Sequence, residues 1–129
     1  MSVGGLNEWP TTWGVAAMQM QTREVGTVQV VRLEGALDAV SSGEVRSELG
    51  GLVRDGSLRL AIDLAQVTRI DSTGLGALVT TLKAVRDRGG ELVLAGLTPP
   101  VRAVVELTRL HRVFDIYDDA EVAAKELSR

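Results

Sequence analysis

From residue 18 onward, segments whose hydrophobic and polar positions alternate as in a strand are interspersed with segments that have helical spacing. Strand-like alternation, or an apolar run of strand length, occurs over residues 18–25, 28–35, 58–64, 91–97 and 114–117. Gly26-Thr27 separates the first two runs by a short turn. The pattern therefore predicts an opening β-hairpin followed by three more strands.

Apolar residues at helical spacing fill the intervals after the hairpin. Ser41 followed by Glu44 resembles a capping box and predicts a helix that ends near Asp55-Gly56. Residues 75–85 carry an amphipathic stripe that stops at Gly89-Gly90. Two more helices are expected, one opening at Pro99-Pro100 and one capped by Asp118-Asp119 and running through Leu127, which makes about four helices in all.

The predicted order β-β-α-β-α-β-α-β-α indicates an α/β fold. Strands alternating with helices imply right-handed crossovers and a mixed, mostly parallel sheet, with the N-terminal hairpin adding an antiparallel pair. Residues 18–129 are expected to form one domain. Residues 1–17, which include Trp9 and Trp13, show no clear period and are expected to be a loosely ordered N-terminal extension.

Composition narrows the possible partners. The chain has 129 residues, 45% apolar and 24% charged, with a net charge of −3, which suits one globular domain. Basic and acidic residues are interleaved without a basic stripe, so a nucleic-acid partner is not expected. No apolar run approaches the ~20 residues of a membrane span, and the N-terminus lacks a signal-peptide layout. We expect a cytoplasmic protein without a membrane partner.

Cysteine and histidine content argues against metal chemistry. The chain has no cysteine and one histidine, His111, so neither a disulfide nor a zinc site is expected. No cofactor is expected either, because no nucleotide-binding glycine motif is present.

The stretch Arg69-Ile70-Asp71-Ser72-Thr73-Gly74-Leu75-Gly76 stands between a predicted strand and a predicted helix. The simplest interpretation is structural, since Asp, Ser and Thr are the preferred helix caps. That interpretation leaves Gly74 and Gly76 unexplained, because each glycine in a helix costs roughly 1 kcal/mol relative to alanine. A local rule broken without visible benefit often marks a functional site.

Enzymatic interpretations of this stretch are weak. It lacks G-x-x-x-x-G-K-S/T and G-x-G-x-x-G, which disfavours a phosphate-cradling loop. It is not the Asp-Ser/Thr-Gly of an aspartic protease, and no second copy exists. A serine nucleophile would need His111, which lies 39 positions after Ser72 at a predicted helix end, and the G-x-S-x-G elbow is absent. We therefore expect a protein that is not an enzyme.

Modification of Ser72 fits the residues better. A hydroxyl at a helix N-terminus lies where backbone N–H groups and the helix dipole favour an added phosphate. Glycines without side chains let another protein approach closely. A phosphate adds roughly −1.5 to −2 charges to such a docking surface, so it can work as a switch.

Ile70-Asp71-Ser72-Thr73-Gly74-Leu75-Gly76 resembles the signature of bacterial anti-sigma factor antagonists, the STAS-domain family. Gly35-Ala36-Leu37-Asp38, before a predicted helix, is similar to that family's G-x-L-D. The resemblance covers about residues 18–127 and implies a single STAS-type domain.

The resemblance also implies a role for each matching residue. Ser72 would be the phosphorylated serine, and Asp38 the acid beside it, contributing to recognition and phosphotransfer. The partner-binding residues would be Asp38 and the loop Asp71, Ser72, Thr73, Gly74, Leu75 and Gly76, together with the exposed side of the helix that follows.

Partner switching is the activity that the resemblance implies. The unphosphorylated protein would bind an anti-sigma factor that is also a serine kinase of the GHKL ATPase type, and so free a sigma factor during a stress response. Phosphorylation would release it, and a metal-dependent serine phosphatase would reset it. The family tends to monomers or weak dimers.

Two alternatives stay open at this point. The domain could be a STAS scaffold or adaptor in a stress-sensing assembly that does not act on a sigma factor. It could also be a nucleotide-binding STAS domain, although no lysine lies near the loop.

Overall fold

A computed structural model describes residues 11–15 and 18–128, with side chains described from residue 18 onward. Over these residues six strands form one sheet, in the spatial order β1-β2-β3-β4-β5-β6. The strands are β1 Thr11–Val15, β2 Met18–Val25, β3 Val28–Leu37, β4 Arg59–Ile70, β5 Glu91–Ala95 and β6 Ile116–Tyr117. The helices are α1 Ser42–Arg54, α2 Ser72–Asp87, α3 Pro99–Leu107, the short 3₁₀ helix η2 Leu110–Arg112 and α4 Ala120–Leu127.

Pairing in the sheet is mixed. β1–β2 and β2–β3 pair antiparallel, whereas β3–β4, β4–β5 and β5–β6 pair parallel. This confirms the predicted α/β class, the opening hairpin of β2 and β3, and the four helices. β1 is an additional strand within the segment for which the sequence predicted no element; residues 1–10 and 16–17 of that predicted extension lie outside the described residues.

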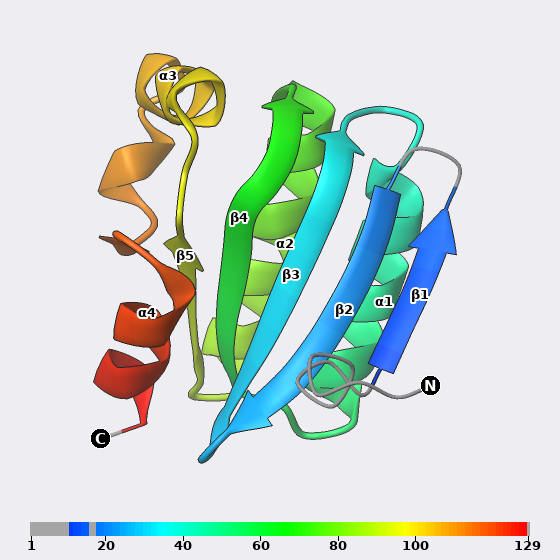
Figure 1. Cartoon of the computed structure of the whole chain (residues 1–129). Helices are drawn as coiled ribbons and strands as arrows, with labels where there is room; N and C mark the ends of the chain where they lie inside the picture. The colour runs from blue at the N-terminus through cyan, green and yellow to red at the C-terminus, as the bar shows by residue number, and fades with distance from the viewer. Residues whose placement is uncertain (1–10, 16–17, 129) are drawn as a thin grey trace, which may run out of the picture.

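Helices cover the sheet unequally on its two faces. α1 and α2 lie side by side on one face and α4 lies on the other, as Figure 1 shows. The larger core lies under α1 and α2 and is built from Val, Leu and Ile side chains such as Leu33, Ile62 and Leu78. α4 buries Ala123, Ala124 and Leu127 against β3, β4 and β5 in a second, smaller cluster. The low aromatic content is therefore compensated by aliphatic packing on both faces.

Several local predictions can be compared with the structure directly. Prolines begin α3, and the Asp119 side chain accepts a hydrogen bond from the Val122 N–H at the start of α4, as predicted. Leu107 lies three residues after Val104, a spacing that predicts a place on the apolar face of α3, but it is 83% exposed at the end of that helix. None of the helices in the described part of the chain combines the length and the apolar character needed to cross a membrane.

Candidate functional site

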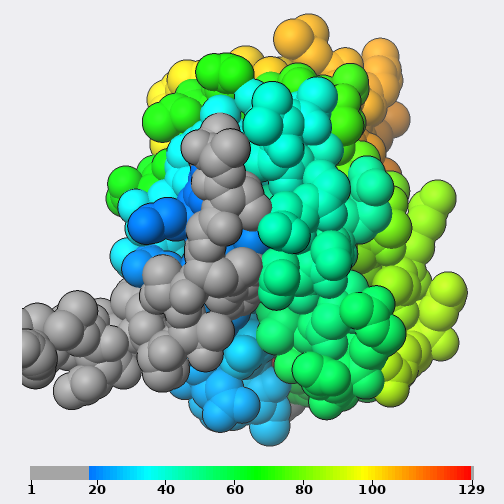
Figure 2. All heavy atoms as spheres, turned by 90° about the vertical axis from the view of Figure 1, so that its right-hand side faces the viewer, coloured from blue at the N-terminus to red at the C-terminus, as the bar shows by residue number. Residues whose placement is uncertain are grey.

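The two segments singled out in the sequence meet at one edge of the sheet. β3 and β4 are neighbouring parallel strands, and their last register pair is Leu37 with Ile70. Asp38 is the residue after β3 and Asp71 is the residue after β4. The Asp71 N–H donates to the Leu37 carbonyl at 3.3 Å. Figure 1 shows the ends of β3 and β4 side by side, and in Figure 2 cyan and green atoms lie together at the top of the molecule. The fold thus joins the Gly35–Asp38 segment to the Asp71–Gly76 loop.

Asp71 begins α2 and acts as its N-cap. Its backbone is extended, with φ −122° and ψ −176°, and its Oδ1 accepts a hydrogen bond from the Gly74 N–H at 2.9 Å. Its carbonyl accepts from the Leu75 N–H at 2.9 Å. Because the aspartate satisfies the helix end, the Ser72 hydroxyl is not needed for capping. Ser72 and Thr73, the first two residues of the helix, are both exposed.

The two loop glycines occupy different surroundings. A Cβ on Gly74 would lie 2.2 Å from the Leu37 carbonyl oxygen and 2.8 Å from its carbon, so only glycine lets α2 begin this close to β3. A Cβ on Gly76 would meet nothing within 4 Å. Leu75, between them, is buried in the core. Gly74 therefore has a packing reason inside the domain that the sequence did not reveal, whereas Gly76 borders open space.

Asp38 lies in a tight turn that buries most of its side chain. Its Oδ1 accepts a hydrogen bond from the Val40 N–H at 3.0 Å, and its carbonyl accepts from the Ser42 N–H at 2.8 Å. The Ser41 hydroxyl accepts from the Asp38 N–H at 3.1 Å and donates to the Ala36 carbonyl at 2.8 Å. The predicted capping box is therefore wrong, because Ser41 points back into the turn and makes no side-chain cap to α1.

The glycine before this turn has a backbone role. Gly35 has φ +112°, a conformation that favours glycine, and the β3–β4 register shifts between Gly35 and Ala36. Such irregularities re-aim the residues that follow. Gly35 thus contributes to directing Asp38 toward the α2 loop.

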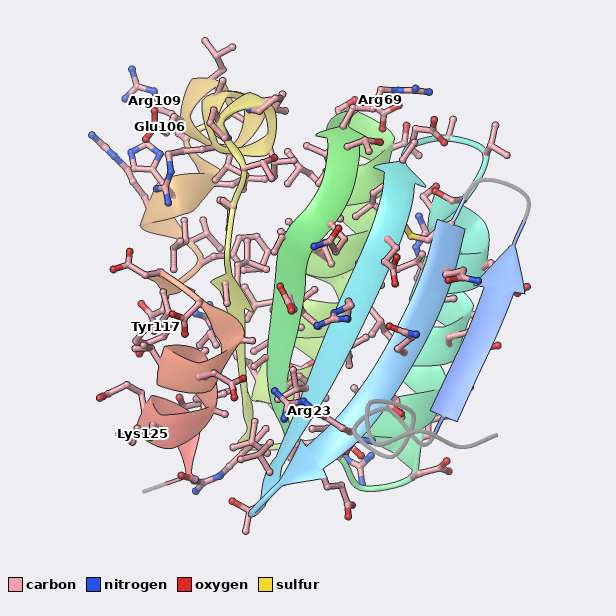
Figure 3. All side chains as sticks on the ribbon, in the orientation of Figure 1. Arg23, Arg69, Glu106, Arg109, Tyr117 and Lys125 are labelled. Atoms are coloured by element: carbon pink, nitrogen blue, oxygen red, sulfur yellow. The ribbon has the colours of Figure 1, made fainter. Side chains whose placement is uncertain are left out.

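Arg69 is the residue at this edge to which the sequence analysis gave no role. Its Nη2 lies 2.6 Å from Asp38 Oδ2 in an ion pair that joins the ends of β4 and β3. The Arg69 side chain is 70% exposed, whereas that of Asp38 is 11% exposed. Figure 3 shows Arg69 projecting beyond the end of β4. The sequence signal for this ion pair was a cation at the end of one predicted parallel strand and an acid at the end of the neighbouring strand.

Other residues weighed in the sequence lie elsewhere. His111 is exposed in η2, outside the Asp71–Gly76 loop. Lys83, Arg86 and Arg88 are exposed on or just after the far end of α2. Among the described residues, no three side chains of His, Cys, Asp or Glu gather where they could hold a metal ion.

The site consists of exposed residues at one edge of the sheet and buried residues that pack beneath them. Ser72, Thr73, the Arg69 guanidinium and Val40, which is 71% exposed, face solvent, while Gly74, Leu75 and Ser41 are buried beneath them. No nucleophile–base pair is present within this group of side chains. The arrangement suits a docking surface with an accessible hydroxyl.

Comparisons with known proteins identify the family of this chain. A family profile described as "STAS domain" matches residues 19–123. The anti-sigma F factor antagonist of Paenibacillus polymyxa is 29% identical over 85% of this chain and 95% of its own length. The anti-sigma-B factor antagonist of Staphylococcus aureus is 32% identical over 71% of this chain and 85% of its own length.

A solved structure with the same fold is the Bacillus cell fate determinant SpoIIAA in the phosphorylated form. It superposes with a TM-score of 0.66 at 19% identity, covering 83% of this chain and 97% of that one.

Proposed function

This chain belongs to the STAS domain family, and from that premise we propose that it is an anti-sigma factor antagonist controlled by phosphorylation of Ser72. The observation that carries the proposal is the exposed Ser72 hydroxyl at the first residue of α2, left free because Asp71 caps the helix. The names of the Paenibacillus and Staphylococcus relatives support the same activity.

Ser72 is the proposed acceptor of the phosphoryl group. In the transfer, its Oγ forms a bond to the γ-phosphorus of ATP, the bond from that phosphorus to the ADP oxygen breaks, and the hydroxyl proton leaves to a base of the kinase. The start of α2 then stabilises the product, because helix N-termini favour anions. The phosphorylated form of SpoIIAA, which shares this fold, is consistent with a phosphate being tolerated on such a domain.

The proposed docking surface consists of Asp38, the Asp71–Gly76 loop and the exposed side of α2. A partner would meet Ser72, Thr73 and Gly76 first, because Gly74 and Leu75 are buried beneath them. The bare backbone at Gly76 allows a close approach. Gly74 and Leu75 would then act by holding the loop in its docking shape.

Phosphorylation would turn binding off through charge. A phosphate adds roughly −1.5 to −2 charges where the partner docks. Opposite a partner carboxylate, an unfavourable change of ~3 kcal/mol weakens binding more than about a hundredfold. We propose that the partner is an anti-sigma factor that is also a serine kinase of the GHKL ATPase type, and that a metal-dependent serine phosphatase restores the binding form.

In this proposal the protein works by binding and release, and it is not an enzyme. Its proposed partners, an anti-sigma factor and a serine phosphatase, regulate transcription, so we propose a cytoplasmic location. The free energy for each cycle comes from the ATP used by the kinase.

The direct test uses the purified chain with a purified anti-sigma factor from the same organism. Binding is measured by calorimetry before and after incubation with ATP, and phosphate incorporation is followed in parallel. We expect Ser72→Ala to bind but never to accept phosphate or be released. Thr73→Val is the matched control, because it removes the neighbouring exposed hydroxyl and should still be phosphorylated. Phosphorylation of Ser72→Ala, or equal affinity of both forms, would refute the proposal.

A further inference from the structure

The ion pair between Arg69 and Asp38 lies immediately beside the proposed phosphorylation site. Arg69 is three positions before Ser72 in the sequence, and the backbone between them runs out of β4 through the extended Asp71. Three extended residues span at most about 10 Å. The long, flexible cationic side chain of Arg69 projects beyond the end of β4 (Figure 3), and Ser72 is the first residue of the helix that follows this strand.

The two members of the pair are held very differently. Asp38 is fixed by the Val40 N–H on one carboxylate oxygen and by the Ser41 hydroxyl on its backbone N–H. The Arg69 side chain is 70% exposed, and its guanidinium pairs with the Asp38 carboxylate. Because the guanidinium is largely solvated, its pairing with Asp38 adds little to stability. Arg69 can thus leave Asp38 without disturbing the turn, since Asp38 Oδ1 keeps the Val40 N–H.

A phosphate on Ser72 would be the stronger partner for Arg69. It carries nearly twice the charge of a carboxylate and three acceptor oxygens, and the guanidinium fork matches two of them. The competing carboxylate offers Arg69 a single oxygen, because its other oxygen is engaged in the turn.

We infer that Arg69 exchanges partners when Ser72 is phosphorylated. Its guanidinium breaks the ion pair with the Asp38 carboxylate and pairs with the phosphate. The inference rests on the proposed phosphorylation of Ser72. Its consequence is that one modification changes two charges at the docking surface. The phosphate appears, and the Asp38 carboxylate loses its counter-charge. In the unphosphorylated form a partner meets a neutralised Asp38–Arg69 pair.

The exchange can be tested on the full chain without any partner. The chain is produced with phosphoserine incorporated at position 72, and the phosphate is titrated by ³¹P NMR in the parent, Arg69→Gln, Arg69→Lys and Arg112→Gln. Arg112 is an exposed arginine of η2 and serves as the matched control. Asp38 and Asp71, the acids at this edge, are present in every variant. The Asp38 side-chain carboxyl ¹³C signal is recorded with and without the phosphate.

We expect the pKa of the phosphate to be at least about 0.5 unit higher in Arg69→Gln than in the parent, because a paired cation favours the dianion. Arg69→Lys should fall between them, and Arg112→Gln should match the parent. Phosphorylation should move the parent's Asp38 carboxyl signal to the position it has in unphosphorylated Arg69→Gln.

Two results would overturn the inference. One is a phosphate pKa that agrees to within about 0.2 unit between the parent and Arg69→Gln. The other is a lowered phosphate pKa with an unmoved Asp38 signal, because Arg69 would then hold both groups at once. Neither readout involves the anti-sigma factor, so this inference can fail while phosphorylation still controls binding, and it can hold if phosphorylation has no effect on binding.

Discussion

The entrances of α1 and α2, residues 38–42 and 71–72, both lie at the ends of neighbouring parallel strands. Their serine side chains nevertheless differ, because those at α1 are buried and the one at α2 is exposed. At α1, Ser41 and Ser42 are buried, and the Ser41 hydroxyl bonds the Ala36 carbonyl and the Asp38 N–H. At α2, Asp71 makes the cap and Ser72 remains exposed. The acid precedes the first helical residue by four positions in one entrance and by one in the other.

That spacing explains the difference. An aspartate placed at the N-cap satisfies the helix with its own carboxylate, so the following hydroxyl is released to solvent. An aspartate placed further upstream forms a turn instead, and the hydroxyl of the next serine makes hydrogen bonds within that turn. A Ser-Ser or Ser-Thr pair after an acid therefore does not by itself identify a modification site.

The sharpest way to test the α2 entrance is to add a methyl group at its two glycines. Gly74→Ala should lower the free energy of unfolding by about 3 kcal/mol, because the new Cβ meets the Leu37 backbone, which cannot easily move. Gly76→Ala should raise it by up to about 1 kcal/mol, since the space is open and alanine favours helix. Urea denaturation measures both. Equal effects from the two changes would contradict the asymmetry described for this loop.

Removing one serine from each entrance tests the comparison itself. Ser41→Ala should cost about 2 kcal/mol of stability, because a buried N–H and a buried carbonyl lose their partner. Ser72→Ala should change stability by less than about 0.5 kcal/mol, because that hydroxyl is exposed. Thermal and urea unfolding of the two variants give the comparison, and a Ser72→Ala loss as large as that of Ser41→Ala would show that both hydroxyls are structural.

The cap of α2 can be weakened separately. Asp71→Ala should cost about 1 kcal/mol, since the Gly74 N–H loses its acceptor. Asp71→Asn keeps an oxygen in the same position and should retain most of the stability. If the two variants unfold at the same urea concentration, the side-chain cap contributes nothing.

The smallest expected change concerns the ion pair that links the two entrances. Arg69→Gln should alter stability by no more than about 0.5 kcal/mol, because the guanidinium is largely exposed. Arg112→Gln is the control for losing a surface charge. A loss of several times that size in Arg69→Gln alone would mean that the pair is a structural element, and Arg69 would then not be available for exchange.

Much of the fold was predictable because its signals are local. Alternation identified the hairpin of β2 and β3, and prolines and Asp119 marked the starts of α3 and α4. The sequence did not predict β1, since Thr11–Val15 shows no alternation and is defined by its pairing with β2. Leu107 follows the helical spacing but lies in the last turn of α3, past the contacts that bury Val101 and Val105.

At the site, the residues were predictable and their contacts were not. Ser72 and Asp38 stood out through the residues around them. The clash that requires Gly74 and the ion pair of Arg69 both depend on segments brought together by the parallel pairing of β3 and β4. Such contacts join positions about 30 or more residues apart, so no local pattern encodes them.

The measurement that tests the central claim most directly is phosphopeptide mapping of this protein isolated from its own cells, with and without stress. We expect phosphate on Ser72 whose occupancy changes with condition, and no phosphate on Thr73, which is also exposed. An unmodified Ser72 under every condition would contradict the phosphorylation switch and leave the Asp71–Gly76 loop as a constitutive docking edge.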